Sequence, residues 1–129
     1  MERQAMQQIK DVMTRDVETI AVDATLQEAA NKMATADVGP LPVIEGGRVV
    51  GMCTDRDLVV WAAGAGGDTR TTTVRDIMTT AVDSCSEDDD VREVARLMQE
   101  KQHKRLVVLD PNQQLVGIVS LADLPVSGV

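Results

Sequence analysis

Apolar residues recur at helical spacing in two stretches of the chain, 26–33 and 91–98. In each stretch four of them lie at positions i, i+3, i+4 and i+7, so that they line one face of a helix. This spacing predicts two amphipathic helices. The residues of the two stripes are Leu26, Ala29, Ala30 and Met33 in the first and Val91, Val94, Ala95 and Met98 in the second.

Short runs rich in β-branched residues follow each predicted helix. "LPVI" and "VVGMC" are separated by "EGGR", and "RLVVLD" and "LVGIV" by "PNQQ", so each pair predicts two strands joined by a turn. A further apolar helix is expected in "DLVVWAAGAGG", where the glycines end it. With a strand before the first helix, each half has the order β-α-β-β-α, which is an α+β fold.

The two halves are copies of one unit. "DVMT" begins at Asp11 and "DIMT" at Asp76, 65 residues later, and many of the positions that follow keep this offset. One extra residue in "DPNQQ" then shifts the offset to 66. The pairs matched beyond it include Gly51 and Gly117, Thr54 and Ser120, and Asp57 and Asp123. A unit this short buries little apolar surface alone, so the copies are expected to pack together about a pseudo-twofold axis.

The composition argues against several classes of function. The net charge is −8, with one Trp and no Tyr or Phe, whereas nucleic-acid binders need a basic face and single-strand binders add aromatic platforms. No apolar run reaches the roughly 18 residues of a membrane span, and the N-terminal stretch has no signal-like apolar region. We therefore expect a cytoplasmic protein that binds neither nucleic acid nor membrane.

The chain also lacks the sequence signatures of metal binding and catalysis. Cys53, Cys85 and His103 are isolated, without the spacing of a disulfide framework or a zinc site. The acidic run 87–90 has one acidic counterpart in the first half, so a helix start enriched in acids explains it better than a cation site. No nucleophile or metalloprotease motif is present. We expect no metal and no enzyme activity.

The Met-Thr starts, "GPLPVIEGGRVVGMCTDRDL" and "HKRLVVLDPNQQLVGIVSLADL" resemble the CBS domain, over about residues 9–124. The resemblance implies a stand-alone tandem pair, or Bateman module. Its parts would be repeat 1 over residues 9–63, a Gly/Thr-rich linker over 64–73, repeat 2 over 74–124 and a C-terminal tail over 125–129.

The same resemblance implies a regulatory role such as energy sensing. The ligand would be AMP, ADP or ATP, and after these NAD or S-adenosylmethionine, held in clefts between the repeats as a regulatory ligand and not as a catalytic cofactor. Binding would change the geometry of the repeats or of a homodimer, and a protein partner would sense that change. The alternative is a dimeric adaptor that binds no ligand.

Site residues are carried over from the family position by position. Thr54, Asp57 and Arg56 would bind ribose and phosphate in the first site, with Val17, Thr19, Ile20, Val38 and Pro40 lining its adenine slot. In the second site the corresponding residues would be Ser120 and Asp123, with Val82, Ser84 and Cys85 lining the slot. His103, Lys104 and Arg105 would supply cations for phosphate.

Two features keep a second interpretation. Thr54 and Asp57 have the spacing of a capping box, which explains them without any ligand, although a cap and a ribose contact are compatible. Trp61 lies in a helix that is apolar nearly all round, so it belongs either to the core or to a dimer interface.

The second site departs further from the family pattern, because Val107 replaces a proline and "SLAD" lacks the Arg of "TDRD".

Overall fold

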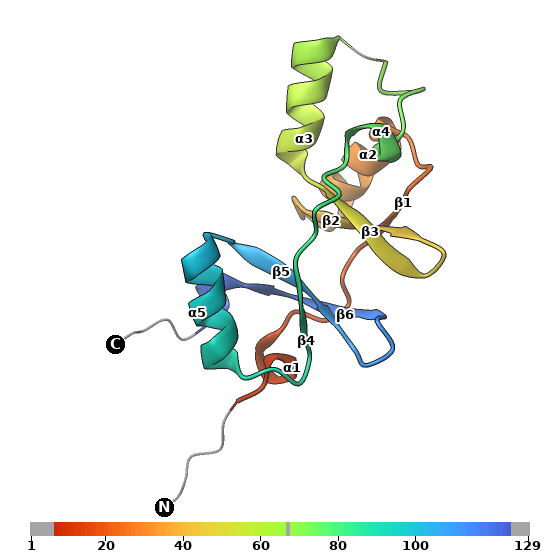
Figure 1. The fold of residues 1–129 in the computed structure, drawn as a ribbon. Coiled ribbons are helices and arrows are strands. Elements are labelled where there is room, and N and C mark those ends of the chain that lie inside the picture. Colours follow the sequence, from red (N-terminus) through yellow and green to blue (C-terminus); the bar gives the residue numbers. More distant parts are fainter. Residues whose placement is uncertain (1–6, 67, 125–129) are drawn as a thin grey trace, which may run out of the picture. The chain divides into compact units, whose positions relative to one another are not determined.

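The computed structural model describes residues 7–66 and 68–124, which form two compact units. One unit is Glu18–Val82, and the other joins the described parts of Met1–Val17 and Asp83–Val129. Each holds a three-stranded sheet and helices, which confirms the predicted α+β class (Figure 1). None of the described helices is long and apolar enough to cross a bilayer. The tail 125–129 lies outside the described residues.

The unit Glu18–Val82 contains the first sheet, in the order β1-β2-β3. β1 pairs parallel with β2, and β2 pairs antiparallel with β3, as the predicted hairpin requires. The elements are β1 (Ile20–Ala21), α2 (Leu26–Ala36), β2 (Leu41–Glu45), β3 (Arg48–Cys53), α3 (Asp55–Val59), the π-helical segment η1 (Val60–Ala65) and α4 (Val74–Ile77). α3 and η1 form one continuous helix, which ends at Gly66 in the left-handed conformation (φ 68°), where glycine carries no Cβ penalty.

The other unit repeats this plan with the sheet order β4-β5-β6. β4 and β5 are parallel, and β5 and β6 form the second hairpin. Its elements are α1 (Ile9–Val12), β4 (Ser84–Ser86), α5 (Val91–Lys101), β5 (Arg105–Leu109), β6 (Leu115–Ser120) and the 3-10 helix η2 (Leu121–Asp123). η2 stands where the first unit has the long helix α3–η1.

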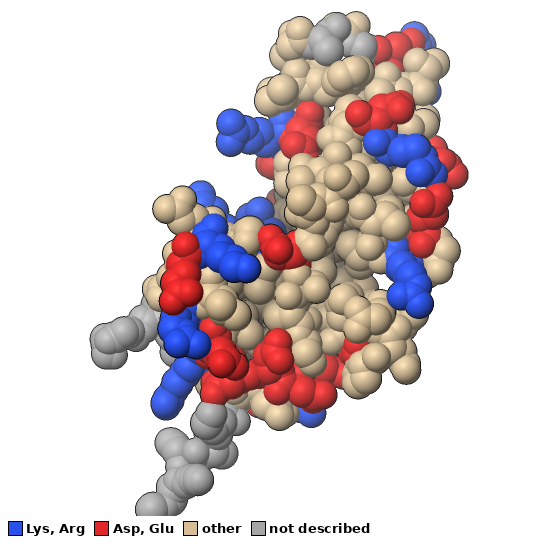
Figure 2. All heavy atoms as spheres, viewed as in Figure 1, with Lys and Arg blue, Asp and Glu red and all other residues tan. Residues whose placement is uncertain are grey.

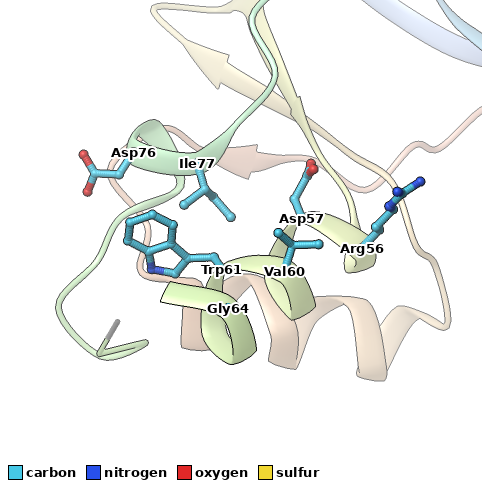
Figure 3. A pocket seen from close by; sticks show the side chains of 7 residues that line it. All are labelled: Arg56, Asp57, Val60, Trp61, Gly64, Asp76 and Ile77. Carbon is cyan, nitrogen blue, oxygen red and sulfur yellow. The ribbon is translucent and has the colours of Figure 1, made fainter. Parts of the chain in front are cut away.

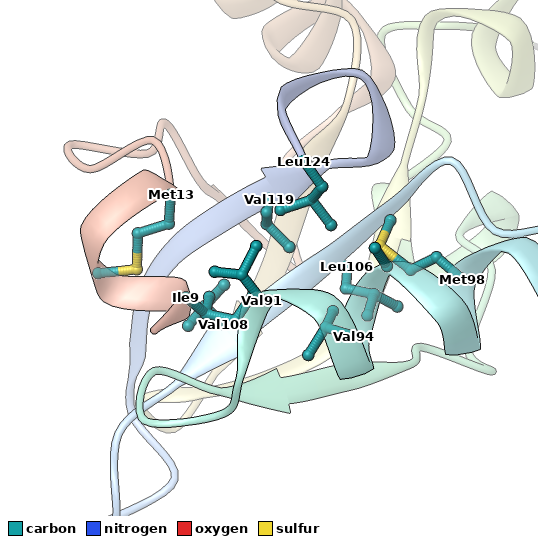
Figure 4. Close-up of a cluster of buried hydrophobic side chains, with 10 residues drawn as sticks. Ile9, Met13, Val91, Val94, Met98, Leu106, Val108, Val119 and Leu124 are labelled. Atoms are coloured by element: carbon teal, nitrogen blue, oxygen red, sulfur yellow. The ribbon is translucent and has the colours of Figure 1, made fainter. Parts of the chain in front are cut away.

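The predicted helix stripes form the two cores. Leu26, Ala29 and Met33 of α2 are buried, whereas Ala30 is exposed at the edge of the stripe. All four stripe residues of α5 are buried against the second sheet, where Ile9 and Met13 join them (Figure 4). Burial of the larger of these side chains contributes roughly 1.5–3 kcal/mol each, so the stripes contribute substantially to stability.

The two Met-Thr motifs dock onto the sheet of the opposite repeat. Met78 and Thr79, which open the second repeat, lie against Gly51 of β3, and Thr79 exchanges two 2.9 Å backbone hydrogen bonds with Met52. Met13 and Thr14, which open the first, lie in the same way against Gly117 of β6. Each compact unit is thus a composite of both sequence repeats. The repeat boundaries themselves stay a prediction.

Matching ion pairs accompany the two docked helices. Lys10 of α1 lies 3.1 Å from Asp88, and Arg75 of α4 lies 3.5 Å from Asp23. These pairs occupy the same positions in the two repeats. They are exposed, so they contribute little compared with the buried Ile9 and its counterpart Val74.

The two cysteines are expected to be unreactive in the folded chain. Burial, and after it the negative charges of Asp57 and Asp89, raise the pKa of Cys53 to about 11 and that of Cys85 to about 12. Near pH 7.5 both thiols are protonated and poor nucleophiles. A disulfide-exchange thiol reagent should therefore label them slowly in buffer and rapidly in denaturant. Equal labelling rates in both conditions would contradict this account.

The raised pKa values also make stability depend on pH. Because the folded pKa values are raised, the contribution of the two thiols to stability is complete below about pH 9 and is lost as the pH rises through 11.

Candidate functional site

Thr54 and Asp57 form a complete capping box at the start of α3. The Asp57 amide donates to Thr54 Oγ1 at 3.1 Å, and the Thr54 amide donates to Asp57 Oδ2 at 3.0 Å. Thr54 is extended and follows β3 directly, so the end of the strand positions both side chains. The cap uses one carboxylate oxygen of Asp57. No described residue donates a hydrogen bond to the other, so the cap leaves it available to a ligand.

The loop before β2 lies next to this helix start. A Cβ at Gly39 would stand 3.3 Å from Asp55 Oδ1, so the Asp55 carboxylate lies close against the backbone of Gly39. This contact brings the loop of Val38 and Pro40 beside the first turn of α3. Two predicted slot residues therefore lie close to the predicted ribose site.

The remaining residues predicted for the first slot are less closely grouped. β1 and β2 are parallel with Ile20 opposite Val43, so Thr19 and Pro40 precede neighbouring strands at the same edge of the sheet. Ile20 is buried in the core, and the carbonyl of Thr19 accepts a hydrogen bond from Lys32. Val17 belongs to the other compact unit.

A pocket of about 660 Å³ runs along the helix α3–η1 from the capping box. Trp61 and Ile77 face each other across it, with Asp57 and Arg56 at one end and Asp76 at the other (Figure 3). The Trp61 indole N–H is buried without a hydrogen-bond partner in the described part of the chain, and its ring packs against the core of this unit. The pocket lining from α4 was not predicted, because it depends on the docking of that helix.

The second motif has a different geometry. Ser120 makes no side-chain cap, η2 has only three residues, and Asp123 is exposed. Arg105 is the register partner of Ser120, and the Leu121 amide donates to the Lys104 carbonyl at 2.9 Å. The fold therefore brings the predicted cations and the predicted second hydroxyl site together within one unit.

The predicted second slot is only partly assembled in this unit. Ser84 and Cys85 lie on β4 opposite Val107 and Val108 of β5, while Val82 belongs to the other unit. The cation segment has an acidic neighbour that was not predicted, since His103 Nε2 lies 2.7 Å from Asp83 Oδ2. The sequence contains only a weak signal for this contact. Asp83 aligns with another acidic residue, Glu18, in the first repeat, and this match alone does not indicate a contact with His103.

Several charged side chains elsewhere form hydrogen bonds or ion pairs with other residues of the chain. On the face shown in Figure 2, Lys and Arg side chains are interleaved with Asp and Glu. Within the acidic run, Asp90 caps α5 through the Arg92 amide at 2.8 Å and Asp88 pairs with Lys10. Across residues 7–66 and 68–124, no three His, Cys, Asp or Glu side chains are grouped to hold a metal ion.

Comparisons with known proteins agree with this geometry. The model of the CBS domain family matches residues 9–64 and 74–124. The CBS domain-containing protein YhcV of Bacillus subtilis is 39% identical over 122 residues, which cover 95% of this chain and 86% of that protein.

Two solved structures show the same fold over most of the chain. Hypoxic Response Protein I with two coordinated zinc ions matches with a TM-score of 0.78 and 33% identity, over 92% of this chain and 96% of that one. The CBS domain pair of protein MJ0100, in complex with 5′-methylthioadenosine and S-adenosyl-L-methionine, matches with a TM-score of 0.79 and 27% identity, over 92% and 93%.

Proposed function

Because this chain belongs to the CBS domain family, with both halves matching that family's model, we propose that it is a regulatory module that binds an adenosine-containing ligand. The ligand would shift the chain between two conformations for which it has different affinities, and a separate protein would respond to that shift. AMP, ADP and ATP are the first candidates, followed by NAD and S-adenosylmethionine.

The observation that carries this proposal is the geometry of Asp57. Its carboxylate is fixed by the Thr54 amide through one oxygen, which leaves a pre-oriented acceptor beside a pocket with apolar walls. A carboxylate held in this way can accept hydrogen bonds from a ribose diol, as the acidic residue of dinucleotide-binding folds does. The structure of protein MJ0100 with two adenosine compounds supports the same ligand class.

The cations of the second repeat support a ligand that carries phosphate. His103 and Lys104 directly precede β5, and Arg105 is its first residue. In the other unit, Arg56 lies next to Asp57 at the end of the pocket. Guanidinium and ammonium groups favour phosphate through charge-assisted hydrogen bonds. We assign Arg56 to a ligand phosphate in the first site, and His103, Lys104 and Arg105 to a ligand phosphate in the second site.

A thermal-shift screen tests the proposed function. We expect at least one of AMP, ADP, ATP, NAD and S-adenosylmethionine to raise the melting temperature selectively. A ligand at about a hundred times its Kd stabilises the folded state by roughly 2.7 kcal/mol, which such a screen detects readily. Guanosine and cytidine nucleotides serve as controls for non-specific phosphate binding. Equal shifts with all bases, or none at millimolar ligand, would contradict an adenosine site.

We also infer a homodimer, because the helix α3–η1 carries an unpaired apolar surface. Val59 is 64% exposed and Val60 60%, and the run 59–63 contains no charged or polar hydrogen-bonding residue apart from the Trp61 indole. Exposed apolar side chains in a continuous patch are typical of an interface. Trp61 itself contacts the core of its own unit, so we place the interface on Val59 and Val60 and not on the indole ring.

The dimer is tested by Val59→Glu, because Val60 also lines the pocket beside Asp57. Sedimentation equilibrium should give twice the chain mass for the wild type and the chain mass for the variant, because a buried carboxylate without a partner opposes association. Gln114→Glu, which adds the same charge on the exposed turn between β5 and β6, should stay dimeric. A monomeric wild type at micromolar concentration would refute this interface.

A further inference from the structure

An acidic side chain contacts His103, one of the residues assigned to phosphate. His103 Nε2 lies 2.7 Å from Asp83 Oδ2, and the two side chains are 33% and 52% exposed. They meet because β4 and β5 are parallel neighbours: Asp83 immediately precedes β4, and His103 lies in the segment that enters β5. The pairing of β4 with β5 therefore brings these two side chains together.

The two cations next to His103 have no such partner. Lys104 and Arg105 are exposed, and neither forms an ion pair with any residue in the described part of the chain. The segment thus presents two cationic side chains without an acidic partner and one imidazole that contacts Asp83. Any anion that reaches this segment meets the carboxylate of Asp83 as a competitor.

The first repeat lacks this arrangement although it has the same acidic position. Glu18, the counterpart of Asp83, lies 3.9 Å from Lys32 of α2. The counterparts of His103 and its neighbours are Val38, Gly39 and Pro40, which carry no charge. The acid is present in both repeats, but only Asp83 is set against a run of cations.

We propose that Asp83 is a specificity-determining residue of the phosphate subsite, an inference that rests on the proposed function. It acts as an internal anion that holds His103, so a ligand phosphate must replace or share that contact. Its negative charge also opposes each further phosphate that approaches Lys104 and Arg105. The subsite thereby favours ligands with a single phosphate, of the AMP type, over a triphosphate.

The size of this effect follows from exposure. Both side chains are partly solvated, so the interaction is screened by water and by salt. Removing the charge of Asp83 should strengthen AMP binding about two- to fivefold, which is the range of an exposed ion pair. The gain should be larger for ATP because the ligand charge is larger, and absent for adenosine, which has no phosphate.

The test compares Asp83→Asn with Glu18→Gln, which removes the same charge at the matched position of the other repeat. Calorimetric titration of both variants and the wild type with adenosine, AMP and ATP gives the ATP-to-AMP affinity ratio. We expect Asp83→Asn to raise this ratio and Glu18→Gln to leave it unchanged. Asp83→Ser serves as a second variant, and urea unfolding of each shows that it is folded.

His103 provides a readout that does not depend on affinity. It is the only histidine of the chain, so its ring ¹⁵N signals are unambiguous. AMP should shift them in the wild type, and Asp83→Asn should shift them without ligand. If the wild type binds AMP but its ATP-to-AMP ratio equals that of Asp83→Asn, or the ring signals do not respond to AMP, the role of Asp83 is overturned. If the wild type binds none of the three compounds, the proposed function itself fails and this inference fails with it.

Discussion

Replacing Gly51 with alanine is expected to destabilise the folded chain by about 2 kcal/mol, the cost of forcing extra volume into a packed site. A Cβ at this position would lie 2.6 Å from Met78 Sδ and 2.9 Å from the Thr79 carbonyl oxygen. The methionine side chain can rotate away, but the carbonyl belongs to a backbone segment that is hydrogen-bonded to Met52. The variant must therefore loosen the docking of α4 on β3. Urea unfolding gives the free energy directly.

Gly64→Ala is the matched control for this experiment. A Cβ at Gly64 meets nothing within 4 Å, and alanine is favoured over glycine in a helix by about 1 kcal/mol. This variant should be as stable as the wild type or slightly more so. Gly117→Ala, which faces Met13 and the Thr14 carbonyl, should repeat the loss seen at Gly51. Wild-type stability in both Gly51→Ala and Gly117→Ala would refute the docking role of the two Met-Thr motifs.

Asp57→Asn is expected to weaken binding of the adenosine ligand about tenfold to a hundredfold. The substitution keeps the shape of the side chain but removes the charged acceptor, and hydrogen bonds to charged groups contribute about 1.5–3 kcal/mol. The helix start should suffer less, by about 1 kcal/mol or under, since asparagine retains a side-chain oxygen for the Thr54 amide. Calorimetric titration and urea unfolding measure the two effects separately.

A second capping box, at the start of α2, provides a control for the contribution of the cap to stability. Thr25 and Glu28 form a second capping box, in which the Thr25 amide donates to Glu28 Oε1 at 2.8 Å and the Glu28 amide donates to Thr25 Oγ1 at 3.1 Å. Glu28→Gln should cost similar stability without changing affinity. If Asp57→Asn binds the ligand as tightly as the wild type and loses stability as Glu28→Gln does, then Thr54 and Asp57 act only as a helix cap.

Local patterns of the sequence were sufficient for most elements of the fold, although they did not predict the short helices α1 and α4, and the second helix expected in repeat 2 is only the 3-10 helix η2. The i, i+3, i+4, i+7 stripes placed α2 and α5, and the β-branched runs placed both hairpins, because periodicity depends only on which face is buried. The spacing of Thr54 and Asp57 predicted the capping box that the structure contains. The resemblance of the repeated motifs to the CBS domain also indicated the family, which the match to the CBS domain model confirms.

Features that depend on docking between distant segments could not be read in this way. The repeat aligned Met13 with Met78 and Gly51 with Gly117, but nothing local indicates that Met78 packs on Gly51 and Met13 on Gly117. The pocket wall from α4 and the contact of Asp83 with His103 were missed for the same reason. Such contacts follow from strand order, which neighbouring residues do not encode.

The central claim, that this chain is a ligand-binding module, is tested most directly by calorimetric titration of the wild-type chain with AMP and with S-adenosylmethionine. The account predicts saturable binding of at least one of them, with a stoichiometry of one or two ligands per chain and a loss of affinity in Asp57→Asn. Absence of saturable heat with both compounds, and also with ADP, ATP and NAD, at millimolar concentration would contradict it and would leave a dimeric adaptor as the better description.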